Sequence, residues 1–324
     1  MHFQDNIDQP SLIRRPLFFA PALALLCVWL AYVGADQWPI VRGFGPAWGV
    51  ITIGPYAMNA ATVAALAGLA GANVWILSGL GYRTQLWATW IECFAAVIAF
   101  FVSFDLSFAF ILRKLWILVS IGLVTTIYIS VISIALACVF AMIGAVAKLS
   151  SSGIAGGLAN FYTSLFRGVP LLMQIYLIYL GLPQVGVIVD AVPAGIAALS
   201  LCYGAYMTEI FRGGIESVPH GQWEASRALG LNFTQTLTRV ILPQAMRVII
   251  PPTGNQFIAM LKDSSLVSVV GVWELMYLAR TQGQSEFRHI EMMLTASLIY
   301  WLFSMALETV QSRIERRFGR ERAR

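Results

Sequence analysis

Charged residues are scarce in this sequence: Asp, Glu, Lys and Arg make up 11% of its 324 residues, whereas apolar residues make up 58%. Soluble domains carry about 25% charged residues, so this chain has too few to cover a water-exposed surface of its size. Lipid can solvate the apolar remainder. The composition therefore excludes an ordinary soluble globule and indicates an integral membrane protein.

The residue patterns of metal, nucleotide and nucleic-acid sites are also missing. The four cysteines, each inside an apolar run, show no CxxC spacing, and the three histidines are scattered. No GxxxxGK[ST] loop is present to hold phosphates, and no basic motif suits a DNA groove. We also find no convergent nucleophile, acid–base or metal groups, so we expect no catalytic residue, metal or bound cofactor and no nucleic-acid partner. The cysteines are interpreted as small apolar side chains.

Long apolar runs dominate the chain. A membrane-spanning helix needs about 20 mostly apolar residues. Eight runs qualify, and together they predict an all-α, polytopic membrane protein with about eight transmembrane helices: 17–35, 49–79, 86–104, 116–147, 161–181, 193–212, 244–262 and 290–310. The second run contains a possible break near Gly54-Pro55 or Gly71.

Basic residues give the predicted orientation. Arg14 and Arg15 precede the first run, Lys148 follows the fourth, and the tail 313–324 is rich in Arg. The positive-inside rule then places both termini and the stretch 213–247 on the cytoplasmic side. Arg113 and Lys114 fall on the outer side in this scheme, which is a mild contradiction.

The seventh run is interrupted by helix-breaking and polar residues. It contains Pro251-Pro252 and Gly254, and the polar stretch 262–266 follows it. Proline removes a helix hydrogen bond, and freed backbone groups are costly in hydrocarbon. We therefore expect a broken helix that faces the protein interior or a wet pathway rather than lipid.

The stretch 213–247 predicts two short helices with a turn between them. Pro219 suits the start of the first helix, and Gly230 suits its left-handed end. Asn232 and Gln235 are spaced as a capping box at the start of the second helix, which Pro243 is expected to interrupt.

This stretch resembles the EAA loop of permeases of ABC importers, whose pattern is EAA, three residues, G, nine residues, I, one residue, LP. The matching positions, with Ser226 and Val240 as mild departures, are Glu224, Ala225, Ser226, Gly230, Val240, Leu242 and Pro243. Three further segments are similar to the polar amino-acid branch of that family: 166–183, 204–222 and 262–275. The resemblance covers about residues 115–315.

The resemblance implies a permease core of five helices at 111–324, with the EAA loop at 213–247. The region 1–110 lies outside the resemblance; it has no strong motif and few polar residues, and we expect an N-terminal membrane extension of about three spans there. It also implies a multi-chain importer in the bacterial inner membrane. Two permease subunits, the same or related chains, form the pore, and separate ATP-binding subunits that hold ATP and Mg dock on the EAA loops. A periplasmic amino-acid-binding protein delivers substrate. This chain itself would not be an enzyme.

The residues expected to couple the chain to the ATPase are Gly221, Glu224, Ala225, Ser226, Arg227, Gly230, Leu242 and Pro243. Glu224 is expected to pair with a basic residue of the ATPase, with Arg227 on the next turn as its alternative partner. Ala225 and Ser226 are expected to pack into the ATPase because small side chains permit close approach, although packing within the loop would also explain them.

Polar residues inside or beside the runs are candidates for the substrate pathway. They are Thr126, Gln174, Glu209, Asn255, Gln256, Lys262, Asp263, Ser264 and Ser265. For Glu209 we favour an internal clamp with Arg212. Lys262 and Asp263 either hold a substrate or pair with each other to stabilise the bend. The uncharged candidates could equally make hydrogen bonds between helices.

The rival function is a stand-alone secondary transporter or channel for a small polar solute. It accounts for the apolar runs and the interrupted helix but not for the EAA-like loop. Several cargoes remain open from the sequence: acidic amino acids, glutamine, histidine and basic amino acids.

Overall fold

The computed structural model describes residues 50–53, 56–102 and 106–319. It divides into two compact units, Met1–Leu106 and Ser107–Arg324. The predicted run 17–35 lies outside the described residues.

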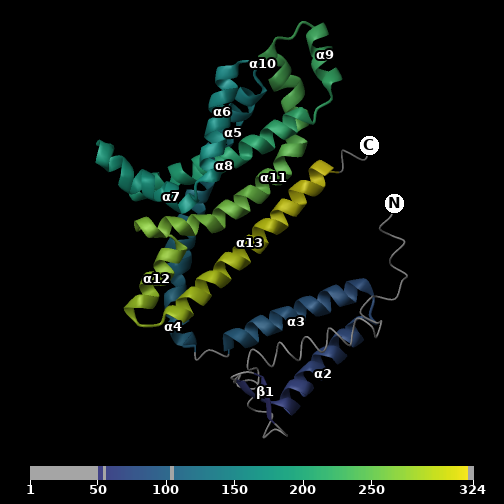
Figure 1. The fold of residues 1–324 in the computed structure, drawn as a ribbon, viewed down its shortest axis with the longest axis vertical. Helices are drawn as coiled ribbons and strands as arrows, with labels where there is room; N and C mark the ends of the chain where they lie inside the picture. Colours follow the sequence, from purple (N-terminus) through teal and green to yellow (C-terminus); the bar gives the residue numbers. More distant parts are fainter. Residues whose placement is uncertain (1–49, 54–55, 103–105, 320–324) are drawn as a thin grey trace. The chain divides into compact units, whose positions relative to one another are not determined.

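The described part of the first unit contains a short hairpin and two helices (Figure 1). Its elements are β1 (Val50–Ile53), β2 (Tyr56–Asn59), α2 (Ala60–Leu77) and α3 (Tyr82–Val102). The strands pair antiparallel, with Val50 opposite Asn59. A hydrogen bond of 2.9 Å from Asn73 Nδ2 to Glu92 Oε2 joins the two helices. Among its described residues, the predicted run 49–79 therefore begins with strands and is helical from Ala60 to Leu77; the possible break at Gly54-Pro55 lies outside the described residues, and α2 continues through Gly71.

The second unit begins with one long helical stretch. It consists of α4 (Phe108–Ile117), the π-helix η4 (Leu118–Leu123) and α5 (Val124–Leu149). The junction residues Ile117 and Val124 keep right-handed helical dihedral angles, so the chain does not break there. The stretch has 42 residues, and at about 1.5 Å per residue it is longer than the hydrocarbon core is thick.

The predicted single run 161–181 is instead two helical segments that bend by 105°. The segments are α6 (Gly153–Gly168) and a second one made of α7 (Leu171–Tyr176), η5 (Leu177–Gly181) and η6 (Leu182–Val185). Pro170 explains the bend, because a residue before proline avoids the helical region and Val169 is extended. Hydropathy alone does not register this break.

Helix α8 (Ala191–Glu216) lies at the centre of the second unit. It packs along α5 through small side chains, which allow helices to approach closely in a membrane protein. The alanines buried in this core are Ala137, Ala141 and Ala145 on α5 and Ala194, Ala198 and Ala205 on α8.

After α8 come two short helices, α9 (His220–Ala228) and α10 (Phe233–Thr236), and then η7 (Leu237–Ile241) and α11 (Leu242–Asp263). The expected interruption at Pro243 is wrong. Pro243 is the second residue of α11, directly after the π-helix η7, and Ile241 and Leu242 before it remain helical.

The expected break at Pro251-Pro252 is also wrong, since α11 continues through both prolines. Gln311 Nε2, on the last helix of the chain, donates a 2.6 Å hydrogen bond to the carbonyl oxygen of Pro251. This contact places the proline-containing part of α11 against protein, as expected. The α-helix ends instead at Asp263, where the 3₁₀-helix η8 (Ser264–Val270) begins.

The unit closes with α12 (Leu275–Ser285) and α13 (His289–Gly319). Glu274 caps α12 and is fully buried: it accepts bonds from the backbone N–H groups of Met276 (2.8 Å) and Tyr277 (2.6 Å) and from the Tyr300 hydroxyl (2.8 Å). Burial raises the pKa of the Glu274 carboxyl to about 7, although these bonds favour its charged form.

Arg113 and Lys114, which contradicted the charge scheme, lie in α4 beside acidic and polar residues. Lys114 Nζ is 3.0 Å from Glu286 Oε1 and donates a 2.8 Å bond to Gln282, and Arg113 lies 3.9 Å from Glu286. These ion pairs show what the two basic side chains contact, but the positive-inside rule counts Lys and Arg regardless of acidic neighbours, so the contradiction stands.

In the described residues, three helical stretches are long and apolar enough to span a membrane: Phe108–Leu149, Ala191–Glu216 and His289–Arg316. The bent pair of α6 and α7–η6 adds a fourth if it counts as one span. The chain is thus a multi-pass, helical membrane protein, and the count of about eight spans is not confirmed.

Candidate functional site

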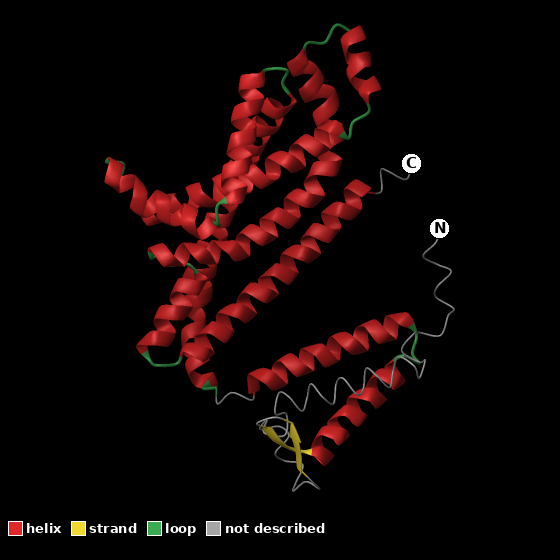
Figure 2. Ribbon diagram, viewed as in Figure 1, coloured by secondary structure: helices red, strands yellow, loops and turns green. Residues whose placement is uncertain are grey.

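The first candidate site is the elbow, which we define as residues 217–241 between α8 and α11. Figure 2 shows it as short helices joined by short loops. Gly230 adopts the left-handed conformation (φ +74°) at the end of α9, as expected for glycine at this position. The predicted capping box is present: the Asn232 side chain accepts from Gln235 N–H (2.9 Å), and the Gln235 side chain accepts from Asn232 N–H (3.0 Å).

Side-chain contacts hold the two halves of the elbow together. The rings of Trp223 and Phe233 stack with centroids 6.2 Å apart. Gln244 Nε2, on α11, donates a 3.2 Å bond to Gln222 Oε1, on α9. The elbow is therefore a folded unit attached to the start of α11.

The structure places the predicted coupling residues on both faces of the elbow. The exposed ones are Gly221, Glu224, Ala225, Arg227, Gly230 and Pro243, whereas Leu242 is half-buried. Ser226 is buried, and its hydroxyl donates a 2.7 Å bond to the Gln222 carbonyl. The geometry of Ser226 thus favours the alternative of packing within the loop. The described residues include no Glu224–Arg227 ion pair, and Glu224 faces solvent.

The second candidate site is a cavity of about 370 Å³ at the bend between α6 and α7. Its lining comes from α6–α7, α8 and α11 and consists of Arg167, Gly168, Val169, Pro170, Leu171, Cys202, Tyr203, Tyr206, Gln256 and Asp263. The Tyr203 hydroxyl donates a 2.7 Å bond to Asp263 Oδ2. The cavity therefore contains one cationic side chain, one anionic side chain and aromatic walls.

Two of the predicted pathway residues, Gln256 and Asp263, line this cavity. The alternative Lys262–Asp263 pair is not found among the described residues. Asp263 instead accepts a hydrogen bond from Tyr203, and the Lys262 side chain is exposed. Sequence reasoning missed Arg167, Tyr203 and Tyr206. Arg167 lies in a segment with family similarity, but nothing in its spacing places it near Asp263.

Other predicted pathway residues make structural contacts and are not part of the cavity lining. The Thr126 hydroxyl donates to the Gly122 carbonyl (3.0 Å) and accepts from Leu275 N–H (3.2 Å). Gln174 Nε2 donates to the carbonyls of Phe166 (2.9 Å) and Val169 (2.8 Å), which stabilises the bend. Three more are not part of the cavity lining: Asn255, Ser264 and Ser265.

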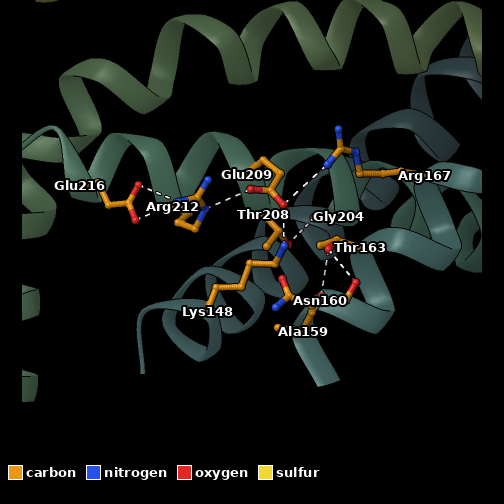
Figure 3. A network of polar contacts seen from close by, with 10 residues as sticks. All are labelled: Lys148, Ala159, Asn160, Thr163, Arg167, Gly204, Thr208, Glu209, Arg212 and Glu216. Atoms are coloured by element: carbon orange, nitrogen blue, oxygen red, sulfur yellow. Dashed lines mark hydrogen bonds and ion pairs between the residues drawn. The ribbon is translucent and has the colours of Figure 1, made fainter. Parts of the chain in front are cut away.

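The third feature is an ion-pair network around Glu209 on α8 (Figure 3). Glu209 Oε1 lies 2.5 Å from Lys148 Nζ and 3.6 Å from Arg167 Nη1, and Oε2 accepts a 3.1 Å bond from Arg212 Nε. Arg212 Nη1 also donates to Glu216 at 2.8 Å. The expected Glu209–Arg212 clamp is present, and Lys148 and Arg167 extend it to α5 and α6.

Comparisons with known proteins agree with this fold. The family model described as "Binding-protein-dependent transport system inner membrane component" matches residues 138–320. This match covers more than half of the chain, and the chain belongs to that family of transporter permeases.

Individual relatives cover the same region. The L-cystine transport system permease protein TcyB of Bacillus subtilis is 40% identical over 64% of this chain and 89% of its own length. The arginine transport system permease protein ArtQ of the same organism is 35% identical over 60% of this chain and 90% of its own. The crystal structure of an amino acid ABC transporter with histidines matches at a TM-score of 0.61 and 33% identity, covering 66% of this chain and 100% of that chain.

Proposed function

We propose that this chain is the membrane-spanning permease of an ATP-driven importer of polar or charged amino acids. The observation that supports this most is the capped, exposed elbow between two long helices in a chain of this family. The names of several relatives refer to cystine, to arginine, or to histidine, lysine, arginine and ornithine, which supports an amino-acid cargo.

The partners follow from this proposal. Separate ATP-binding subunits, carrying ATP and Mg, dock on the exposed face of the elbow. A second permease subunit, identical or related, completes the pathway, and a binding protein delivers the amino acid from outside. The elbow and both termini then lie in the cytoplasm, and the chain resides in the bacterial inner membrane. Alternating access exposes the cavity to one side at a time.

The cavity at the α6–α7 bend is the proposed substrate site. An amino acid carries an ammonium and a carboxylate, and the lining offers Asp263 for the first and Arg167 for the second. Interrupted helices near substrate sites are common in transporters, because freed backbone groups and polar side chains can replace water. Here α6 ends at the bend and α11 changes into η8 at Asp263.

A labelling experiment tests the elbow. Single cysteines are placed at exposed Ala225 and at buried Ser226 in a chain whose four cysteines have been replaced. Ala225→Cys should react with a membrane-impermeant maleimide only after the cytoplasmic face is opened, and the ATP-binding subunits should protect it. Ser226→Cys is the matched control and should react slowly in both cases. Reaction of Ala225→Cys in intact spheroplasts would overturn the proposed topology.

Transport assays separate the proposal from the rival. Uptake of labelled amino acids into vesicles should stop when the partner ATPase cannot hydrolyse ATP, whereas a stand-alone secondary transporter would continue. Asp263→Asn should reduce uptake, and its neighbour Lys262→Gln, which lies outside the cavity lining, should not. Equal loss in both variants would remove the cavity from the proposal.

A further inference from the structure

Arg167 takes part in two of the features described above. It lies in the last turn of α6, directly before the bend, and it lines the cavity. Its guanidinium also lies 5.3 Å from the centre of the Tyr206 ring and 3.6 Å from Glu209 Oε1. Figure 3 shows it approaching Glu209 from the side of α6, apart from Lys148 and Arg212. Arg167 therefore connects the cavity with the ion-pair network.

The contact between Arg167 and Glu209 is the weakest of the three that Glu209 makes. At 3.6 Å it is longer than the contacts with Lys148 (2.5 Å) and Arg212 (3.1 Å). The Lys148 side chain is 9% exposed and that of Arg167 is 43% exposed. If Arg167 leaves, Glu209 keeps two cationic partners, so its charge stays compensated.

The network also carries an excess of positive charge. It contains three cations, Lys148, Arg167 and Arg212, and two carboxylates, Glu209 and Glu216. Because a guanidinium offers a planar fork that suits a carboxylate, the excess cation can bind an incoming carboxylate in the cavity. Asp263 carries the opposite charge in the same lining.

We propose that Arg167 is a specificity-determining residue that binds the substrate's α-carboxylate in the cavity and releases Glu209 when it does so. This inference rests on the proposed function, because it assumes an amino-acid substrate in this cavity. It requires cargo with a free carboxylate, and it links occupancy of the cavity to the ion pairs of α8. Glu216 ends that helix, directly before the elbow.

Binding measurements on the full-length chain in lipid nanodiscs test the requirement for a carboxylate. The probes are L-arginine, L-glutamine and L-cystine, each beside its carboxamide, which keeps the ammonium and lacks the carboxylate charge. The wild type should prefer the acid over the amide by roughly 10- to 100-fold, as expected for a charge-assisted hydrogen bond. Arg167→Gln should abolish that preference, and Arg167→Lys should restore part of it.

Arg280 provides a matched control. Like Arg167 it lies over a tyrosine ring, that of Tyr277 at 5.6 Å, but it is not part of the cavity lining. Arg280→Gln should therefore keep the wild-type preference. If Arg167→Gln also keeps it, the inference about Arg167 is overturned while the proposed function stands. If the complete transporter, assembled with its ATP-binding subunits and binding protein in vesicles, imports no polar or charged amino acid, the proposed function itself fails.

A second pair of variants tests the exchange with Glu209. Glu209→Gln removes the carboxylate that competes for Arg167, so the affinity for the acid should rise by up to about fivefold, the range expected for a partly exposed ion pair. Glu216→Gln is the control, because Glu216 pairs with Arg212 and not with Arg167. A lower affinity in Glu209→Gln, or an equal rise in both variants, would contradict the exchange.

Discussion

Two neighbouring glycines on α8 offer a matched test of how this helix packs. A Cβ added to Gly214 would lie 2.4 Å from Ile249 Cγ1 and 3.0 Å from Ile249 Cδ1, on α11. Ile249 is 1% exposed and β-branched, so it has little room or rotamer freedom to move. A Cβ added to Gly213 would meet nothing within 4 Å.

Both substitutions to alanine should stabilise the helix through its propensity, but only one of them should also destabilise the protein through overpacking. Each should gain about 0.8–1 kcal/mol, because alanine has a higher helix propensity than glycine. Only Gly214→Ala should also lose about 1–3 kcal/mol through overpacking. Gly213→Ala is therefore expected to match or exceed the wild type in stability, and Gly214→Ala to lie about 1–3 kcal/mol below Gly213→Ala.

Unfolding of the purified chain in detergent micelles by a denaturing detergent measures this difference. A double-mutant cycle identifies its cause: in an Ile249→Ala background the cost of Gly214→Ala should disappear, because the atoms that it meets are gone. Equal stability of the two glycine variants, or a cost that persists without the Ile249 side chain, would refute the close contact between α8 and α11.

Three further predictions concern single contacts. Gly230→Ala should destabilise the elbow by about 1–2 kcal/mol, because alanine is strained at φ +74°. Amide hydrogen exchange in 220–241 should accelerate, while the exchange of α13 stays unchanged. Gln311→Leu should cost about 0.5–1.5 kcal/mol in detergent unfolding, because it removes one hydrogen bond to the partly buried Pro251 carbonyl. Loss of Ser312, whose exposed hydroxyl bonds within its own helix, should cost little. The pKa of Glu274 is about 7 in the folded chain, against an ordinary value of 4.5, so the folded chain binds an extra proton between these pH values. The free energy of unfolding should therefore fall as pH rises from 4.5 to above 7, by as much as about 3 kcal/mol. Glu274→Gln should flatten that pH profile, and an unchanged slope would contradict the shifted pKa.

The elbow was predictable because its signals are local. Gly230 ends α9 and Asn232 caps α10 through bonds that span three residues, so the sequence contains both partners side by side. The helical, membrane-spanning class was predictable for a similar reason, because each apolar run can be recognised from its own residues without knowledge of distant contacts.

The prediction of a break at Pro251-Pro252 was wrong because it considered only the local effect of proline on its own helix. The structure adds a contact from another helix: the Pro251 carbonyl accepts a hydrogen bond from Gln311, which is 60 residues away. The same limit applies to the cavity: Tyr203 and Asp263 are also 60 residues apart, and only the packing of α8 against α11 and η8 brings them together. No rule of sequence spacing links residues so far apart, so the cavity could not be predicted from the sequence.

The order of elements suggests how the elbow and the cavity communicate. Helix α8 carries Tyr203 and Tyr206 at the cavity and ends at Glu216, where the elbow follows. Helix α11 begins after the elbow and ends at Asp263, back at the cavity. The two helices lie side by side (Figure 1), and each is about 30–40 Å long at 1.5 Å per residue. Both helices connect the elbow with the cavity, and they pack closely at Gly214. A displacement of the elbow can therefore reach the parts of the cavity lining on α8 and α11 without passing through a flexible loop. A change in the charge contacts of Glu209, midway along this route, would in turn alter the helix that holds the elbow.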